Sequence, residues 1–568
     1  MASLTEHSNT PTTRRKAAKS GLSLTPVRFV FFVSCYFFLV LNLALLARLG
    51  TIIGSLDQVR LGFVLTIPLF FVACFNAIFS LFTVFRCEKP VIVTFILVSS
   101  LLSYAMYNYG TIVDRDMIVN ILETNSGEAK SYLNLSAALW FVLTGVLPAA
   151  LVLKLNIRRS SVIGELLMKL ASIMVSVLVV LVIAAFYYKD YASVGRNNAY
   201  LNKMIIPTHF AHSLYGYVNE TYFKEDIPYR TLGEDARLIG ATQDGRKKLL
   251  VLMVGETARA ANFQYGGYER DTNAFTQPLG VTYFRQVSSC GTATAVSVPC
   301  MFSRLSHRDF SDTLADNQDN LMDIVQRAGI DTLWLENDGG CKGVCGHIKT
   351  IEFKPDAANP VCDGDYCQDQ VLLDGLSARL DRLSEQNNII VLHMVGRHGP
   401  TYYKRYPAGF SHFQPDCQRS DIQNCDARQL NNTYDNTLYY SDYIMSEVIK
   451  LLKQHQDIST GMLYVSDHGE SLGESGLYLH GMPYSLAPTE QTHVPMLTWF
   501  SDTFAADKQL DEQCLGQAAH AKAYSHDNLF DSILGLMDVS TDLYRPELDI
   551  FNACRHQGRL ALNQASSK

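Results

Sequence analysis

Long apolar stretches are concentrated in the first third of the chain. They cover residues 27–47, 61–85, 91–106, 137–155 and 163–187. Each approaches the ~20 residues that an α-helix needs to cross the hydrocarbon core of a bilayer. The third stretch is the shortest, so the pattern predicts five transmembrane helices, with four as the alternative. A cleaved signal peptide would also explain the first stretch, but that stretch is too long and further spans follow it.

Basic residues cluster at alternate ends of these stretches. They are Arg14, Arg15, Lys16 and Lys19 before the first, Arg86 and Lys89 after the second, and Arg158 and Arg159 after the fourth. With five spans the three clusters lie on one side of the membrane, which the positive-inside rule identifies as the cytoplasm. The acid-rich loop 114–128 falls on the opposite side. An odd number of spans then exports everything after about Lys189.

Beyond the last span the sequence has the mixed polar and apolar pattern of a water-soluble globular domain. At 568 residues the chain is too long for one ordinary domain. The expected parts are a cytoplasmic tail at 1–26, a transmembrane domain at 27–188, bridging helices and a linker at 189–245, a globular domain at 246–554 and a C-terminal tail at 555–568. The formal net charge is -7, and the sequence has no basic stripe of the kind that binds nucleic acid. We expect a membrane-embedded monomer.

From residue 246 onward, short apolar runs alternate with helical patterns. Strands are expected at 249–254, 388–395 and 461–465, and helices at 320–328 and 434–453. This alternation predicts an α/β domain with a parallel sheet flanked by helices.

Each predicted strand is followed by side chains that can bind a metal. Glu256 follows the first strand, His398 the second, and Asp467 with His468 the third. In open α/β sheets, ligands collect at the carboxyl ends of the strands. One such residue would be weak evidence, because acids and histidines at strand ends are often hydrogen-bonded loop residues. Three strand ends together predict a metal site. His393, inside the second strand, is interpreted as a core histidine.

The cysteines indicate an oxidising compartment. Of the 13, three lie in or beside the spans and are interpreted as small apolar residues: Cys35, Cys74 and Cys87. The other ten are neighbours in sequence: Cys290 and Cys300, Cys341 and Cys345, Cys362 and Cys367, Cys417 and Cys425, with Cys514 and Cys554 left. An even set of local pairs predicts disulfides. The alternative is a four-thiolate zinc site formed by Cys341, Cys345, Cys362 and Cys367.

Segment 289–297 is small, polar and glycine-containing before the chain turns apolar. We expect a loop that leads into a helix N-terminus, where free N–H groups and the helix dipole favour an anion. A Cys290–Cys300 bridge would fix this loop. Thr292 or Thr294 is a candidate nucleophile, because coordination to zinc would favour the ionised hydroxyl. The alternative is that both threonines are helix caps.

Four motifs occur in a specific order along the chain. They are Val-Gly-Glu-Thr at 254–257, Ser-Cys-Gly-Thr-Ala-Thr at 289–294, His-Gly-Pro-Thr-Tyr-Tyr at 398–403 and Ser-Asp-His-Gly-Glu at 466–470. With these motifs the chain resembles the lipid A phosphoethanolamine transferases, a family that includes the mobile colistin-resistance enzymes. The resemblance covers nearly the whole chain, spans included. It implies an alkaline-phosphatase-like α/β domain in the periplasm, attached to a multi-pass domain in the bacterial inner membrane.

The resemblance also implies a reaction. Zinc would be held by Glu256, Thr294, Asp467 and His468, and Thr294, rather than Thr292, would be the nucleophile. Phosphoethanolamine would move from phosphatidylethanolamine to Thr294 and then to lipid A. The alternatives are another envelope acceptor such as core heptose, phosphoglycerol transfer, hydrolysis by a periplasmic phosphatase, and a non-catalytic envelope-binding or sensor protein.

Other positions match residues that the family uses for its substrate. His398 and His480 match positions that contact the transferred phosphoryl group or a second zinc ion, and Lys342 matches a phosphate-binding lysine. Two positions depart from the family pattern. Arg397 stands where the family often has serine, and we expect it to bind lipid phosphate or to point to solvent. Gly339 replaces a family serine near Lys342, which removes one hydroxyl contact.

The resemblance assigns the ethanolamine head group to a fourth set of residues. Asn120, Thr124 and Glu128 recur every four residues, so one face of a short helix can present all three. An acidic side chain suits an ammonium group. The alternative is a solvated helix face.

Overall fold

The computed structural model describes residues 23–56, 59–83, 87–223, 227–239, 245–356, 358–383 and 385–555. The chain divides into two compact units. The helical unit comprises the chain up to Ser100 with Phe141–Asn197, and the α/β unit comprises Leu101–Trp140 with the chain from Asn198 onward. The basic residues Arg14, Arg15, Lys16, Lys19 and Arg86 lie outside the described residues, as do nearly all of both predicted tails. The predicted orientation and domain limits therefore stay predictions.

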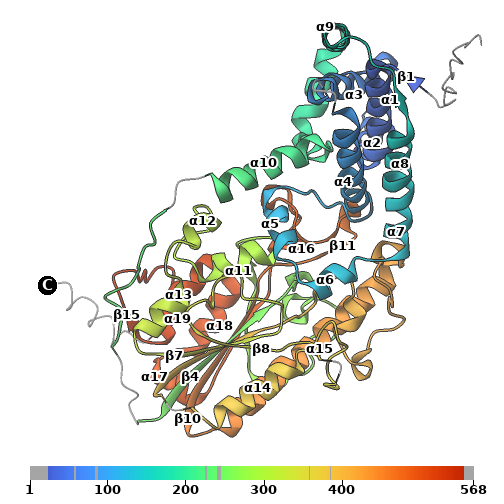
Figure 1. Cartoon of the computed structure of the whole chain (residues 1–568). Helices are drawn as coiled ribbons and strands as arrows, with labels where there is room; N and C mark the ends of the chain where they lie inside the picture. The colour runs from blue at the N-terminus through green and yellow to red at the C-terminus, as the bar shows by residue number, and fades with distance from the viewer. Residues whose placement is uncertain are drawn as a thin grey trace, which may run out of the picture. The chain divides into compact units, whose positions relative to one another are not determined.

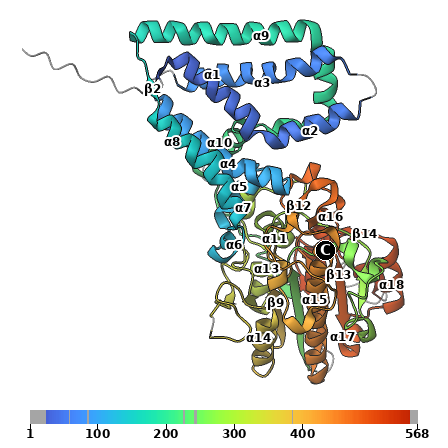
Figure 2. The same cartoon turned by 90° about the vertical axis from the view of Figure 1, so that its right-hand side faces the viewer.

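The apolar stretches of the N-terminal part form helices (Figure 2). Those long and apolar enough to cross a membrane are α3 (Leu61–Phe82), α4 (Glu88–Tyr109), Leu135–Lys154, which comprises α7, η2 and α8, and α9 (Val162–Asn197). A fifth is interrupted: Pro26–Leu41, which comprises α1 and η1, and α2 (Leu43–Gly54) meet at a bend of 65°. The described part of the chain thus has four spans, or five if the bent pair is one span, which confirms the predicted number.

Two spans are longer than the apolar pattern indicates. The third, predicted at 91–106, has three more residues at each end, and α9 continues for ten residues past the predicted end at 187. Polar contacts support the extension of α9. Arg60 forms an ion pair with Asp190, and its guanidinium lies 5.0 Å from the centre of the Tyr187 ring. Hydropathy therefore locates a span, whereas polar contacts such as these support the helix beyond it.

A seven-stranded sheet lies at the centre of the α/β unit. Its order is β5 (Thr282–Phe284), β13 (Met496–Phe500), β10 (Ile458–Ser466), β4 (Lys247–Gly255), β9 (Asn387–His393), β7 (Asp331–Glu336) and β8 (Lys349–Glu352). The strands from β10 to β8 are parallel, as predicted. At the other edge β13 and β5 run antiparallel to their neighbours, which the sequence did not indicate.

The three predicted strands are β4, β9 and β10, but β9 is shorter than expected. It ends at His393, not at residue 395. The physical reason is the turn at Gly396, whose φ of +52° favours glycine. A Cβ atom at Gly396 would also lie 2.8 Å from the Glu256 carbonyl oxygen, so the chain passes closely over the end of β4.

Helices cover both faces of the sheet (Figure 1). A hydrophobic core lies on each face, and alternate residues of β4 pack into one core or the other. Leu249, Val251 and Met253 pack with α14 (Gln370–Leu380) and α15 (Ala427–Gln454). Leu250, Leu252 and Val254 pack on the other face. The helices of that face are α11 (Thr294–Phe302), α13 (Leu321–Arg327), α18 (Glu512–Ala521) and α19 (Leu529–Leu536). The predicted helices 320–328 and 434–453 are α13 and most of α15.

The described part of the α/β unit also contains further α-helices and three two-stranded sheets. The helices are α5 (Arg115–Glu123), α6 (Ser126–Ser131), α10 (Thr208–Tyr222), α12 (Asp312–Ala315), α16 (Thr489–Thr492) and α17 (Asp502–Asp507). The two-stranded sheets pair β11 (Ser471–Leu472) with β12 (Tyr478–Leu479), β14 (Ala523–Ser525) with β6 (Gln286–Ser288), and β15 (Val539–Ser540) with β3 (Arg237–Leu238).

The five predicted disulfides are all present. They join Cys290 to Cys300, Cys341 to Cys345, Cys362 to Cys367, Cys417 to Cys425 and Cys514 to Cys554. The alternative of a four-thiolate zinc site is wrong, because its four sulfur atoms are used in two of these bridges. Cys35, Cys74 and Cys87 are free.

Candidate active site

Three neighbouring strands bring their carboxyl-terminal residues together at one end of the sheet. Glu256 directly follows β4, Asp467 and His468 directly follow β10, and His398 lies five residues beyond β9. His398 Nδ1 is 3.0 Å from Glu256 Oε1, and His468 Nε2 is 3.7 Å from the same oxygen. All four side chains are buried. The strand-end residues singled out in the sequence thus form one cluster.

Thr294 joins this cluster and Thr292 does not. The loop predicted at 289–297 leads into α11, which begins at Thr294 and has Ala293 as its N-cap. Thr294 Oγ1 lies 3.1 Å from Glu256 Oε2 and 3.4 Å from His468 Nε2. Thr292 donates its hydroxyl to the Met482 carbonyl at 2.6 Å. Neither threonine caps the helix, so the capping alternative is wrong.

The hydrogen bonds of His468 determine which nitrogen carries its proton. Nδ1 lies 2.9 Å from the Gly469 carbonyl oxygen, which can only accept, so Nδ1 is the donor. Burial lowers the pKa of His468 to about 4, so the ring is neutral and Nε2 carries a lone pair. That lone pair faces Thr294 Oγ1, Glu256 Oε1 and, at 3.3 Å, Asp467 Oδ2.

A cation between these groups would remove the repulsion between the lone pair and the surrounding oxygens. Asp467 Oδ2 is buried and has no hydrogen-bond partner among the described residues. Burial, with Asp467 and Asp338 nearby, raises the pKa of Glu256 well above its usual range. Imidazole nitrogens and carboxylate oxygens are ligands that zinc prefers. The residues present therefore fit a zinc ion.

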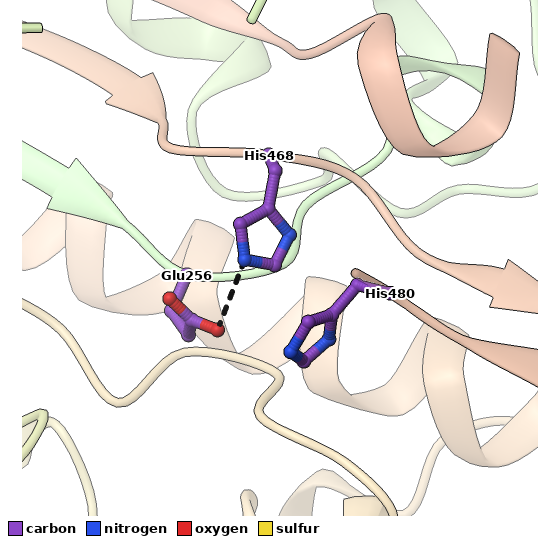
Figure 3. Close-up of side chains that lie close together, drawn as sticks. All are labelled: Glu256, His468 and His480. Atoms are coloured by element: carbon purple, nitrogen blue, oxygen red, sulfur yellow. Dashed lines mark ion pairs between the residues drawn. The ribbon is translucent and has the colours of Figure 1, made fainter. Parts of the chain in front are cut away.

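Two groups of side chains converge closely enough to hold a metal. One is Glu256, His468 and His480 (Figure 3), and the other is Glu256, Asp338 and His398; in each, the ligand atoms lie within 4.8 Å of one another. His480, just after β12, has its ring 4.4 Å from that of His468 and 5.5 Å from that of His398. His480 therefore borders the same cluster as Glu256, His468 and His398.

Asp338 was missed in the sequence. It lies two residues beyond β7, so the strand-end rule would have identified it if 331–336 had been predicted as a strand. Burial raises the pKa of Asp338 to about 7, against the effect of His393 and His398. Glu470, the last residue of the Ser-Asp-His-Gly-Glu motif, was also missed in the sequence. It is fully buried, with Oε1 3.4 Å from His480 Nδ1, and burial raises its pKa to about 8.

His393 is buried, as a core histidine would be, but it is not an apolar core residue. Its Nδ1 lies 2.7 Å from Glu336 Oε2, and its Nε2 lies 3.7 Å from Asp338 Oδ2. Burial lowers the pKa of His393, but Glu336 and Asp338 outweigh this and raise it to about 9. A cationic His393 therefore offsets the negative charge of Glu336 and Asp338.

Glu128 reaches the cluster, although not in the way that its spacing indicated. Its Oε1 lies 2.9 Å from His398 Nε2. Burial lowers the pKa of His398, but the carboxylates of Glu128 and Glu256 raise it well above its usual range. His398 therefore lies between the carboxyl groups of Glu128 and Glu256, and Glu128 is not part of a solvated helix face.

The prediction that Asn120, Thr124 and Glu128 share one helix is wrong. Asn120 lies in α5, Thr124 is extended after that helix ends, and Glu128 lies in α6. The reason is Asn125, whose side chain accepts from the Glu128 N–H at 2.9 Å and starts a new helix. Thr124 instead donates its hydroxyl to the Asn120 carbonyl at 2.8 Å. A spacing of four does not show where one helix stops.

Arg397 contradicts both expectations for it. Its side chain is fully buried, and it donates to the Tyr464 hydroxyl at 3.1 Å and to the Glu256 carbonyl at 3.5 Å. It therefore neither points to solvent nor has a surface for lipid phosphate, because it lies beneath the cluster between the ends of β4 and β10. Lys342 is half-buried and interacts electrostatically with Glu128 and Asp338.

Gly339 makes room for Asn125. Its φ is +85°, and a Cβ atom there would lie 2.4 Å from Asn125 Nδ2. Gly339→Ala is expected to lower the free energy of unfolding by about 1–2 kcal/mol and to displace α6 with Glu128, which reduces activity. The matched control is Gly340→Ala, where φ is +130° and no atom lies within 4 Å. Thermal unfolding and transfer rates of both full-length variants check this. Equal loss of activity in both would contradict a role for the Asn125 contact.

Comparisons with known proteins agree with this arrangement. Residues 248–539 match the family model described as Sulfatase, and residues 71–222 match the one described as Phosphoethanolamine transferase EptA/EptB. Phosphoethanolamine transferase EptA of Escherichia coli (strain K12) is 40% identical over 538 residues, which are 94% of this chain and 98% of that protein. Phosphatidylethanolamine transferase Mcr-1 of Escherichia coli is 34% identical over 92% of this chain and 96% of that protein.

A solved structure extends the similarity to both units. It is the integral membrane protein lipooligosaccharide phosphoethanolamine transferase A (EptA) from Neisseria meningitidis, with a TM-score of 0.90 and 37% identity. The match covers 94% of this chain and 100% of that chain. This protein therefore belongs to the EptA family of phosphoethanolamine transferases, membrane enzymes with an α/β domain of the sulfatase and alkaline phosphatase type.

Proposed function

We propose that this protein transfers phosphoethanolamine from phosphatidylethanolamine to lipid A through a covalent intermediate on Thr294. The observation that carries this proposal is the position of Thr294 Oγ1, 3.1 Å from Glu256 Oε2 and 3.4 Å from His468 Nε2. A hydroxyl at the start of α11 also faces the positive end of the helix dipole, which favours a phosphoryl group there.

Zinc is the cofactor that we propose for this site, held by Glu256, Thr294, Asp467 and His468. When bound, it supplies Lewis-acid stabilisation of negative oxygens and favours ionisation of the threonine hydroxyl. The chain itself keeps the ligands in place. Asp467 Oδ1 accepts from the backbone N–H groups of Thr257 at 3.1 Å and of His468 at 2.6 Å. These contacts fix the carboxylate before any metal binds.

In the first step the Thr294 oxygen forms a bond to phosphorus, and the bond from phosphorus to the diacylglycerol oxygen breaks. The hydroxyl proton of Thr294 is directed at Glu256 Oε2. The departing diacylglycerol oxygen takes up this proton from Glu256, so atoms and charge are balanced. His398, His480 and Lys342 stabilise the phosphoryl oxygens as negative charge shifts between them.

In the second step a phosphate oxygen of lipid A forms a bond to the same phosphorus, and the bond to Thr294 breaks. The Thr294 oxygen takes up the proton that the acceptor phosphate releases, which restores the enzyme. Because each step is an in-line displacement, the configuration at phosphorus is retained overall. Both substrates are lipids, so we propose that the α/β unit lies in the periplasm at the outer face of the inner membrane, where its five disulfides are stable.

The acceptor is tested with purified full-length protein, phosphatidylethanolamine and lipid A. Mass spectrometry is expected to show a phosphoethanolamine addition to lipid A, and none to lipid A whose phosphates have been removed. The second comparison uses a lipopolysaccharide in which core heptose is the only free acceptor site. Modification of heptose alone would move the assignment to that acceptor. Release of free phosphoethanolamine without any modified lipid would favour the phosphatase alternative.

Glu128→Gln is expected to weaken binding of the ammonium-bearing donor. The carboxylate is buried, and a charged hydrogen bond of this kind contributes about 1.5–3 kcal/mol. We therefore expect KM for phosphatidylethanolamine to rise about 10- to 100-fold while kcat changes less. Initial rates over a range of donor concentrations measure this, with Glu123→Gln, an exposed acid of α5, as the control. Equal use of phosphatidylglycerol by the unaltered enzyme would contradict recognition of an ammonium.

A further inference from the structure

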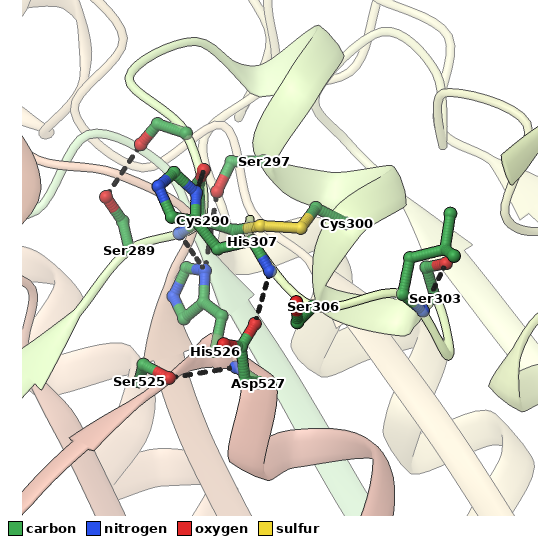
Figure 4. Close-up of a disulfide and its surroundings, with 12 residues drawn as sticks. Ser289, Cys290, Ser297, Cys300, Ser303, Ser306, His307, Ser525, His526 and Asp527 are labelled. Carbon is green, nitrogen blue, oxygen red and sulfur yellow. Dashed lines mark hydrogen bonds between the residues drawn. A yellow bond between two sulfur atoms is a disulfide. The ribbon is translucent and has the colours of Figure 1, made fainter. Parts of the chain in front are cut away.

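His526 is a buried histidine that none of the motifs includes. It begins η12 (His526–Asn528), which Ser525 caps, and its exposed fraction is 2%. Its ring contacts three segments that are distant in sequence: the loop before α11, α11 itself and the end of β10. Figure 4 shows the contacts to Cys290 of the loop and Ser297 of α11. These are the segments that carry Thr294, Asp467 and His468.

The partners of His526 determine its tautomer. Nδ1 lies 3.0 Å from the backbone N of Cys290, so it accepts a hydrogen bond. Nε2 lies 2.9 Å from the carbonyl oxygen of Ser466, so it donates one. Burial lowers the pKa of His526 to about 4, which agrees with a neutral ring. One imidazole thus joins the nucleophile loop to the residue before Asp467.

Cys290 is held at each of its polar groups and at its sulfur. Its N–H is bound by His526, its carbonyl lies 2.6 Å from His307 Nδ1, and its sulfur is bonded to Cys300 of α11. The backbone N–H of His307 in turn donates to Asp527 Oδ1 at 2.7 Å. Two adjacent residues of η12 therefore anchor the loop (Figure 4).

Ser297 of α11 makes a second connection to the same strand end and to His526. Ser297, one turn after Thr294, donates its hydroxyl to the Asp467 carbonyl, and its oxygen lies 3.4 Å from His526 Nδ1. The strand end is already held by the hydrogen bonds of β10 to β4 and β13. The loop has no such ladder. Besides the contacts of Cys290 and Ser297, it is held at its ends, where the Ser289 N–H donates to the Thr492 carbonyl and the Thr292 carbonyl accepts from the Gly481 N–H. Between these two residues its position depends on Cys290.

We propose that His526 is a positioning residue, which fixes the nucleophile loop relative to the strand end that carries Asp467 and His468. It acts through Cys290 and Ser466, without contact to Thr294, and the inference rests on Thr294 being the nucleophile. Misplacement of a reacting group by about 1 Å can lower a rate by about 100-fold. A shift of the loop would therefore affect the chemical step more than substrate binding.

Two variants separate the two bonds of the ring. In His526→Asn the amide oxygen takes the place of Nδ1 and keeps the acceptor for the Cys290 N–H. In His526→Gln the amide nitrogen takes the place of Nε2 and keeps the donor to the Ser466 carbonyl. Each variant loses one buried hydrogen bond, so a purely structural role predicts similar melting temperatures and similar losses of activity.

We expect the variants to differ in rate. In the full-length enzyme with phosphatidylethanolamine, His526→Gln should lower the rate of adduct formation on Thr294 about 10- to 100-fold, with KM within about threefold of the unaltered value. His526→Asn should stay within about fivefold of the unaltered rate, because it keeps the bond to the Cys290 N–H, while the strand end at Ser466 stays fixed by its hydrogen bonds to β4 and β13. Hydrogen exchange provides a second readout that needs no substrate. The segment around Cys290 should exchange faster in His526→Gln and should remain protected in His526→Asn.

Equal rate losses in both variants, in step with their melting temperatures, would overturn the proposal. Unchanged exchange around Cys290 in His526→Gln would overturn it as well. Failure of the unaltered enzyme to form any adduct would instead contradict Thr294 as the nucleophile, and the exchange measurement would still decide whether His526 holds the loop.

Discussion

Thr294→Ala is expected to abolish the covalent adduct and to lower transfer by about 10⁴-fold or more, because it removes the hydroxyl that lies beside Glu256 and His468. The measurement is the intact mass of the full-length protein after incubation with phosphatidylethanolamine. An added mass equal to phosphoethanolamine should appear on the unaltered protein and not on the variant. Zinc content should be similar to that of the unaltered protein, because three other ligands remain.

The matched control for this experiment is Thr292→Ala. This threonine lies two positions earlier, and its hydroxyl bonds to the Met482 carbonyl instead of entering the cluster. Loss of that bond should cost about 1 kcal/mol of stability and leave the adduct intact. An adduct on Thr294→Ala at the unaltered rate would refute Thr294 as the nucleophile. No adduct on the unaltered protein, with zinc bound and donor accessible, would point to a different lipid head group.

Removal of zinc is expected to lower activity by about 10³-fold or more, since the metal contributes several kcal/mol to charge stabilisation in the transition state. The melting temperature should also fall, because a metal ion that binds only the folded protein stabilises it. Chelation followed by metal analysis, transfer assays and thermal unfolding tests this. Added zinc should restore both quantities.

Asp467→Asn tests the same role of zinc by weakening one of its proposed ligands. It keeps the size of the side chain and an acceptor for the N–H groups of Thr257 and His468, but it removes the charge. We expect lower zinc content and a comparable loss of activity. Full activity in a preparation verified to be free of metal would contradict a catalytic role for zinc. An increase in melting temperature on chelation would show that these side chains do not form a metal site.

The local pattern of apolar and polar residues was sufficient to predict the elements that position the site. Apolar runs located the spans and three strands of the sheet, because burial in lipid or between two helical layers demands continuous apolar sequence. The strand-end rule then identified Glu256, Asp467 and His468, which do converge. Asp338 was overlooked only because the run at β7 was not recognised as a strand.

The sequence-based predictions failed at two places, for different reasons. The spacing of Asn120, Thr124 and Glu128 matched a helix, but the cap formed by Asn125 divided it. Arg397 carries a charge that suggests solvent, yet its acceptors come from β4 and β10. The cap at Asn125 is local, since its partner is the Glu128 N–H three residues on, and Asn followed by Glu at that spacing is a helix-start signal that was overlooked. The burial of Arg397 is not encoded in the neighbouring sequence, because it depends on what the rest of the fold packs against the residue.

The sequence by itself determined the membrane spans, the α/β class, the cysteine pairs and the residue types at the strand ends. These depend on periodicity, on composition and on residues close together in the chain. Only the tertiary structure decided which threonine reaches the cluster, that Glu128 pairs with His398, and that His526 joins the loop to β10. The partners of His526 are 236 and 60 positions away. Contacts over such separations arise when the strands pair, and no local pattern specifies them.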